Sequence, residues 1–226
     1  MAYIAQQIFN ILQLGSLYAL IALGYTLVYG LLAMINLAHG DLFMLGAFCC
    51  FACATLLGLP FVPTLVLTMV AVSLLAALIE RLAYRPLRQA PRVSAIITAL
   101  GVGILLESLT LIIYPYPKHI PALIPQTIWS IAGVTLSPIK VLIIVIAVVL
   151  MWGLDLFVRR TLTGTAMRAV SSQREIVPLM GIAVDRIIAI TFAIGGALGA
   201  AAGVMYGLAY PVIDPYMGIM VGWKAF

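Results

Sequence analysis

Long apolar runs alternate with short polar connections along this chain. A helix needs about 20 apolar residues to cross the hydrocarbon core of a bilayer. The second and third runs are separated only by Gly58–Pro60, which is typical of a tight turn. The final piece, Pro211–Phe226, is apolar but too short to span. Six runs are predicted to cross a membrane: Ile8–Leu32, Leu42–Leu59, Phe61–Ile79, Val93–Tyr114, Ile139–Val158 and Ile187–Tyr210.

The composition agrees with this pattern. Of 226 residues, 65% are hydrophobic and only 8% are charged, whereas soluble domains are about half apolar and a quarter charged. A water-soluble core of this size has no means of hiding so much apolar surface. We therefore expect an all-α, polytopic transmembrane bundle of about six spans plus a short terminal segment, forming one domain over residues 1–226.

The distribution of cations predicts an orientation. The connection Pro115–Ser137 carries one cation, Lys118, so by the positive-inside rule it is the external loop, and the arginine-rich loop over residues 159–186 is cytoplasmic. Counting spans then places the N-terminus outside. The net charge of +5 suits anionic lipid rather than nucleic acid. Two connections hold most of the arginines: Arg81, Arg85, Arg88 and Arg92 in one, and Arg159, Arg160, Arg168, Arg174 and Arg186 in or beside the other.

A polar break, Asn36-Leu37-Ala38-His39-Gly40-Asp41, separates the first two apolar runs. In one interpretation it is helix punctuation, with Asn36 or Asp41 capping the next helix and Gly40 ending the previous one. In the other it is a discontinuous helix whose polar groups line a path through the bundle. Our candidates for such a path are Asn36, His39, Asp41 and Glu107, the last being an ionisable group inside a span. Glu107 is expected about two turns from the outer end, where water can reach it.

Two further patterns concern packing and docking. Glycines at a strict four-residue step make a flat stripe on which another helix backbone packs closely: Gly195, Gly199, Gly203 and Gly207. The loop over residues 159–186 is mixed in polarity, with short helical patches over Ala166–Met180 and a stop at Gly181. It is either an ordinary solvated loop or a docking surface. Its candidate docking residues are Arg168, Ser171, Arg174, Glu175 and Gly181.

The chain shows no pattern of an enzyme. His39 and His119 fall on different connections, and no nucleophile motif or phosphate-cradling loop occurs. Cys49, Cys50 and Cys53 lie in one apolar run without His or carboxylate at ligand spacing, so we expect apolar helix side chains and no metal site or cofactor. If ATP powers this protein, it is hydrolysed on another polypeptide.

Two stretches resemble a known family. The first is Leu14–Gly30 leading into Met34-Ile35-Asn36-Leu37-Ala38-His39-Gly40-Asp41, and the second is Leu179–Ile182 with Val184–Arg186 and then Ala189–Gly203. Both are similar to the inner-membrane permeases of branched-chain amino acid ABC importers, which begin with a Gly-Ser-x-Tyr-Ala-Leu run and an Ile-Asn-x-Ala-His-Gly-Asp/Glu signature. The resemblance runs through nearly the whole chain.

The resemblance implies a multi-pass permease of the bacterial inner membrane that carries Leu, Ile or Val by alternating access. It implies four kinds of partner: ABC ATPase subunits, a second permease subunit in a homo- or heterodimer, a periplasmic substrate-binding protein and the lipid bilayer. By the same analogy, Arg168–Gly181 is the ATPase-coupling region. The chain departs from the family in having Arg168-Ala169-Val170 where an acidic residue is expected. It also stops at Gly222–Phe226 where further spans are expected, so we expect a form that lacks the C-terminal part.

Other functions stay open from the sequence alone. A permease for urea or short amides has a similar sequence. A proton-coupled secondary transporter or channel would use Glu107 or Asp41, and a structural membrane scaffold would carry no solute at all.

Overall fold

The computed structural model describes every residue except 1, 33–35, 89, 125–128, 132–133 and 175. The described part is mostly helical. The α-helices are α1 (Ala2–Leu32), α2 (His39–Leu56), α3 (Phe61–Ile79), α4 (Arg92–Ile113), α5 (Pro138–Arg160), α6 (Leu162–Ser172), α7 (Val184–Ala209) and α8 (Met217–Ala225). The shorter elements are η1 (Glu80–Tyr84), η2 (Arg85–Leu87), η3 (Val177–Met180), β1 (Lys118–His119), β2 (Trp129–Ile131), β3 (Val134–Leu136) and β4 (Val212–Ile213).

The helices confirm the prediction of a polytopic bundle. Six of those described are long and apolar enough to cross a bilayer. The run Phe61–Ile79 matches α3 residue for residue, although the helix continues through η1 and η2. The tight turn before it is also confirmed, because Gly58 has a φ of 59°, a conformation that glycine adopts without steric cost. The six spans are Gln6–Leu32, His39–Leu56, Phe61–Leu87, Val93–Ile113, Pro138–Arg160 and Val184–Ala209.

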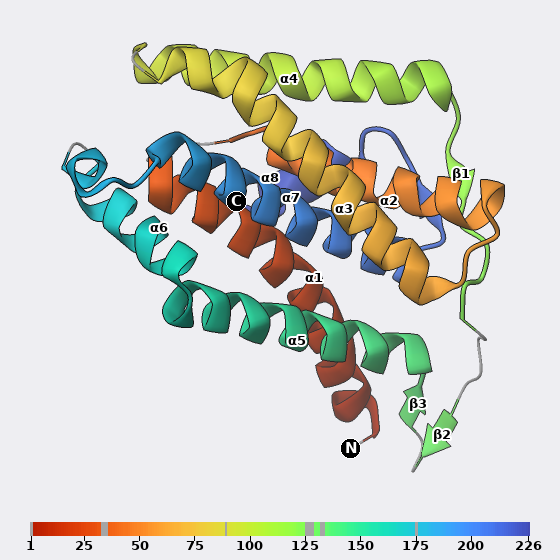
Figure 1. Cartoon of the computed structure of the whole chain (residues 1–226). Coiled ribbons are helices and arrows are strands. Elements are labelled where there is room, and N and C mark those ends of the chain that lie inside the picture. Colours follow the sequence, from red (N-terminus) through yellow and green to blue (C-terminus); the bar gives the residue numbers. More distant parts are fainter. Residues whose placement is uncertain (1, 33–35, 89, 125–128, 132–133, 175) are drawn as a thin grey trace.

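Helix α7 is the central element of the bundle. It packs against α1, α2 and α3, and most of its length is buried (Figure 1). Its small residues allow this, because glycine and alanine let neighbouring helix backbones approach closely. A side chain added at Gly203 would begin 2.8 Å from the backbone nitrogen of Ala47 on α2. At Gly195 it would begin 3.4 Å from the carbonyl oxygen of Gly24 on α1.

Helix α3 has one buried face and one exposed face. One face packs on α7 and is buried, at Thr64, Thr68, Val72 and Ala76. The opposite face repeats the same four-residue step and is exposed. Large apolar side chains on an exposed face are stable in lipid, so this face suits contact with acyl chains. Its residues are Val62, Val66, Val70, Leu74 and Leu78.

The two ends of the bundle differ in chemistry. Both arginine-bearing connections, η1–η2 before α4 and the segment from α5 to α7, lie at the left in Figure 1. We call this the arginine end. The strands lie at the right, and we call that the strand end. The shared position of the two connections agrees with their assignment to one face of a membrane.

Short strands lie in the connections of this otherwise helical fold. Strand β1 pairs antiparallel with β4, with Lys118 opposite Ile213, and β2 pairs with β3. Ile120 adds a backbone hydrogen bond to Pro211. Backbone groups outside helices need hydrogen-bond partners, and the paired strands supply them. The β1–β4 pair also joins the connection after α4 to the segment that follows α7. Hydrophobic periodicity does not reveal such two-residue strands.

The polar break is not the helix punctuation that one interpretation expected. Gly40 does not end α1, because α1 ends at Leu32 and Gly40 lies in the first turn of α2. Ala38 is the N-cap residue, and neither Asn36 nor Asp41 caps the helix with its side chain. Gly40 is needed there for packing, since α8 crosses it closely: a side chain at Gly222 would begin 3.0 Å from the Gly40 Cα.

Candidate functional site

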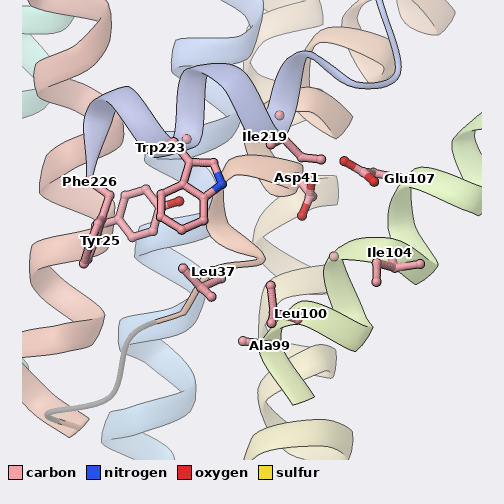
Figure 2. Close-up of a pocket in the computed structure, with 13 residues that line it drawn as sticks. Tyr25, Leu37, Asp41, Ala99, Leu100, Ile104, Glu107, Ile219, Trp223 and Phe226 are labelled. Atoms are coloured by element: carbon pink, nitrogen blue, oxygen red, sulfur yellow. The ribbon is translucent and has the colours of Figure 1, made fainter. Parts of the chain in front are cut away.

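A cavity of about 110 Å³ lies where the start of α2 meets α1, α4 and α8. Two carboxylates stand in its wall, those of Asp41 on α2 and Glu107 on α4. Most of the rest of the wall is apolar, and Figure 2 shows how these side chains surround the space. The apolar side chains of the wall include Leu37, Leu100, Ile104, Ile219, Trp223 and Phe226.

Asp41 and Glu107 point toward one another across one side of this cavity, with Tyr25 and Trp223 at the other side (Figure 2). Asp41 is 5% exposed and Glu107 8%, and each has a buried oxygen without a hydrogen-bond partner among the described residues. Glu107 lies six residues before the end of α4, as expected, but its side chain is buried rather than exposed. Its side chain turns into the bundle toward α2, where two carboxylates meet in mostly apolar surroundings.

The first residue of the polar break lies outside the cavity wall. Asn36 is buried, and its Oδ1 accepts a hydrogen bond of 2.6 Å from the hydroxyl of Tyr84 in η1. The Tyr84 ring packs in turn on Phe192 of α7, at 5.2 Å between ring centroids. The structure therefore places Asn36 in a contact that joins the α1–α2 connection to the arginine end of α3.

This contact gives a testable prediction. We expect Tyr84→Phe to lower the free energy of unfolding by about 0.5–1.5 kcal/mol, because it leaves the buried Asn36 oxygen without its donor. Thermal unfolding of the purified protein in detergent measures the change. Tyr29→Phe is the matched control, since Tyr29 is exposed on α1. Equal melting temperatures for the two variants would contradict the assigned role of the Tyr84 hydroxyl.

His39 lies between α1 and α7. Its ring packs against Tyr25 at 4.6 Å between centroids, and a side chain at Gly199 would begin 3.6 Å from the imidazole. The imidazole is almost completely buried, and its Nε2 has no hydrogen-bond partner among the described residues. The glycines of α7 thus make room for His39 as well as for the helix backbones.

The segment between α5 and α7 forms a helix and a protruding turn. Helix α6 is fixed by Thr161, whose hydroxyl accepts from the Gly164 nitrogen, and by buried residues such as Met167 and Val170. Arg168 and Ser171 are exposed on its outer side, and Glu175 lies outside the described residues. Gly181 ends η3 with a φ of 77°, a conformation that L side chains rarely adopt.

The turn η3 presents apolar side chains to the outside. Leu179 is 85% exposed and Met180 is also exposed, whereas Val177 beside them is buried and anchors the turn. Two neighbouring bulky apolar side chains are thus held outward at a defined turn, which makes this turn a candidate for contact with a partner. Gly181 is one of the docking residues predicted from the sequence, whereas Leu179 and Met180 are recognised only from their exposure in the structure.

An ion-pair cluster, also missed from the sequence, joins the two arginine-bearing connections. Arg88 pairs with Glu80 and with Asp185 at the start of α7, and Arg85 pairs with Asp185 at 2.6 Å. Arg174 lies close enough to interact with Arg88 and Asp185. Burial lowers the pKa of Arg174, the Arg88 cation lowers it further, and the Asp185 carboxylate opposes both effects. A guanidinium stays protonated in proteins, so Arg174 remains a fixed cation.

Comparison with known proteins identifies the family. The family described as "Branched-chain amino acid transport system / permease component" matches residues 7–226. The permease protein BraD of the high-affinity branched-chain amino acid transport system of Pseudomonas aeruginosa is 42% identical, over 98% of this chain and 76% of its own length. The LivH permease proteins of Salmonella typhimurium and Escherichia coli are 38% identical, over 99% of this chain and 77% of theirs. No solved structure matches.

The match covers nearly the whole chain and extends through all the elements that build the cavity and the turn η3. A bundle of six candidate spans agrees with the membrane-embedded role that the family name describes. The chain belongs to the family of branched-chain amino acid transport permease components, and it is a multi-pass membrane subunit for transport rather than an enzyme.

Proposed function

We propose that branched-chain amino acids cross the inner membrane through a pathway to which this chain contributes, driven by ATP hydrolysis on separate subunits. The observation that supports this most is the family match over residues 7–226, with relatives named for high-affinity branched-chain amino acid transport. The cavity at Asp41 supports the same cargo class, because its wall is mostly aliphatic and aromatic. Asp41 and Glu107 contact the cargo, and Asn36 and His39 hold α1, α2 and α7 around it.

In this proposal the arginine end faces the cytoplasm. The segment over residues 159–186 receives an ATPase subunit, with Leu179 and Met180 as the apolar contact and Arg168, Ser171 and Arg174 around it. The partners at the other face are a periplasmic binding protein and its cargo, which approach the strand end and the loop over residues 115–137. A second permease subunit completes the pathway. Lipid covers the exposed apolar faces such as that of α3.

The proposed mechanism is alternating access. Movement of the ATPase subunits displaces α6 and η3. The ion pairs from Arg88 to Glu80 and Asp185 pass that movement to α3 and α7, because they join the two connections at the arginine end. Helix α7 touches α1, α2 and α3 along its length, so its displacement changes how α2 faces α4 and α8. The cavity at Asp41 opens to one side of the membrane at a time.

Uptake measurements test this proposal. The chain would be expressed with its ATPases, second permease and binding protein in cells that lack their own leucine uptake. We expect radiolabelled leucine uptake that isoleucine and valine compete with and urea does not, and that stops when ATP is depleted but survives a protonophore. Competition by urea would overturn the cargo, and uptake that follows the proton gradient instead of ATP would overturn the energy source.

A substitution in the turn η3 tests the proposed ATPase contact. We expect Leu179→Asp to lower leucine uptake about tenfold or more, because a charge on the apolar contact costs the binding free energy of a hot spot. The melting temperature should stay unchanged, since the side chain is exposed. Leu179→Met is the matched control, because it keeps an apolar side chain at the same exposed position. Co-purification of the ATPase with Leu179→Asp at wild-type yield would contradict the contact.

A further inference from the structure

Among the residues that the structure describes, no cation pairs with the carboxylates of Asp41 and Glu107. Their buried oxygens Oδ1 and Oε1 have no hydrogen-bond donor among the described residues, and no lysine, arginine or histidine is part of the cavity wall. The two side chains come from different helices and interact electrostatically. Two like charges in apolar surroundings repel, and each is costly without a partner of opposite charge. A positively charged ligand would therefore stabilise the site, because the described residues supply no cation there.

Two glycines on other helices leave space for the Asp41 carboxylate. A side chain at Gly218 of α8 would begin 2.7 Å from Oδ1, and one at Gly103 of α4 would begin 2.5 Å from Oδ2. Because only hydrogen atoms stand at these two positions, α4 and α8 pack closely around the carboxylate.

The other side chains of the wall favour an organic ammonium ion over a metal ion. Metal ions such as Ca²⁺ take six to eight oxygen ligands, and Mg²⁺ needs near-ideal octahedral geometry. Among the described residues of the wall, the side chains with oxygen atoms are Asp41, Glu107 and Tyr25, and most of the others are apolar, such as Leu100 and Ile104. A primary ammonium group has three donors and is satisfied by two carboxylates and one further acceptor. An alkyl chain attached to it would lie against the apolar wall.

We propose that Asp41 and Glu107 together bind a primary ammonium group carried on a branched alkyl chain, the α-ammonium of the transported amino acid. This inference rests on the proposed function and adds to it the recognition of one end of the cargo. Asp41 lies on α2 and Glu107 on α4, so both carboxylates reach one ammonium group only when these two helices are correctly oriented. The same movement that changes access would therefore also change the affinity for the ammonium group.

Trp223 lines the cavity and provides a local signal. The chain has three tryptophans, so Trp129→Phe with Trp152→Phe leaves Trp223 as the sole tryptophan, which can be excited selectively over tyrosine. The full chain in lipid nanodiscs would be titrated with isoamylamine, which is leucine without its carboxylate, and with isocaproate, which is leucine without its ammonium. We expect isoamylamine to change the fluorescence in a saturable way and isocaproate to have no effect. A sodium titration against choline chloride should also have no effect.

Isosteric variants complete the test. We expect Asp41→Asn and Glu107→Gln each to weaken isoamylamine binding about tenfold or more, since a charge-assisted hydrogen bond is lost. Asp155→Asn, which removes a carboxylate of the exposed pair with Arg159, is the matched control and should bind normally. The comparison of the two ligands needs no variant, so it holds even if a variant fails to fold.

Three results would overturn the inference: equal binding of isoamylamine and isocaproate, a saturable response to sodium alone, or wild-type affinity in both carboxylate variants. None of these depends on the ATPases or on uptake. If the wild-type assembled transporter took up no leucine but the chain still bound isoamylamine, the proposed function would be contradicted and the ammonium site would stand.

Discussion

Replacing Arg88 with methionine is expected to destabilise the protein by about 3–5 kcal/mol, the largest effect of any single polar substitution that we predict. Glu80 is 2% exposed and Arg88 8%, and the pair joins η1 to the residue that follows η2. Removing the guanidinium leaves the Glu80 carboxylate buried without its partner, and it also releases Asp185 on α7. Denaturant unfolding of the purified protein in detergent measures the loss.

A double-mutant cycle identifies the origin of that loss. Glu80→Gln in the Arg88→Met background should restore much of the stability, because the uncompensated charge is gone. Arg159→Met is the matched control, since Arg159 and Asp155 form an exposed pair on α5, and such pairs contribute about 0–1 kcal/mol. A loss in Arg88→Met no greater than in Arg159→Met would show that the cluster does not hold the arginine end together.

Substitution of Gly203 by leucine is expected to abolish the folded bundle, and Gly203→Ala to cost about 1–3 kcal/mol. At this position α7 lies directly on the backbone of α2. A side chain would begin 2.8 Å from the Ala47 nitrogen and 3.2 Å from the Gly46 carbonyl carbon, and rigid backbone cannot yield as a flexible side chain can. Size-exclusion chromatography in detergent should show aggregate for the leucine variant, and thermal unfolding should give the cost of the alanine variant.

The control for Gly203 is another glycine of a spanning helix. Gly153 on α5 has open space where a side chain would extend, so Gly153→Leu is expected to leave a monodisperse protein with a nearly unchanged melting temperature. If Gly203→Leu were as well behaved as Gly153→Leu, then α7 would not be the helix on which α1 and α2 pack.

The spanning helices could be predicted from the sequence because a single physical requirement decides them. Only a continuous apolar helix of sufficient length is stable in hydrocarbon, so each apolar run marks its own helix. The predicted Ile139–Val158 and the observed Pro138–Arg160, for example, differ by one and two residues at their ends. Helix ends are set by local groups such as the Thr161 hydroxyl. Hydrophobic periodicity does not locate these ends to the residue.

The site could be predicted only in part. Asp41 and Glu107 stood out because a carboxylate inside an apolar run is rare, but no spacing or pattern indicated that they face the same cavity. Tyr25, Trp223 and Gly218 join them from helices far apart in the chain, and such contacts follow from packing rather than from spacing. The pairing of Arg88 with Glu80 and Asp185 was hidden for the same reason, although the arginine cluster itself was plain.

The claim on which the function depends is that the arginine end faces the cytoplasm. Single cysteines at Leu179 and at Tyr116, in a chain whose Cys49, Cys50 and Cys53 are replaced by alanine, report the two ends separately. They would be treated with a membrane-impermeant maleimide in intact spheroplasts. The account predicts labelling at position 116 in intact spheroplasts and at position 179 only after permeabilisation. Labelling of position 179 in intact spheroplasts, with position 116 protected, would contradict it.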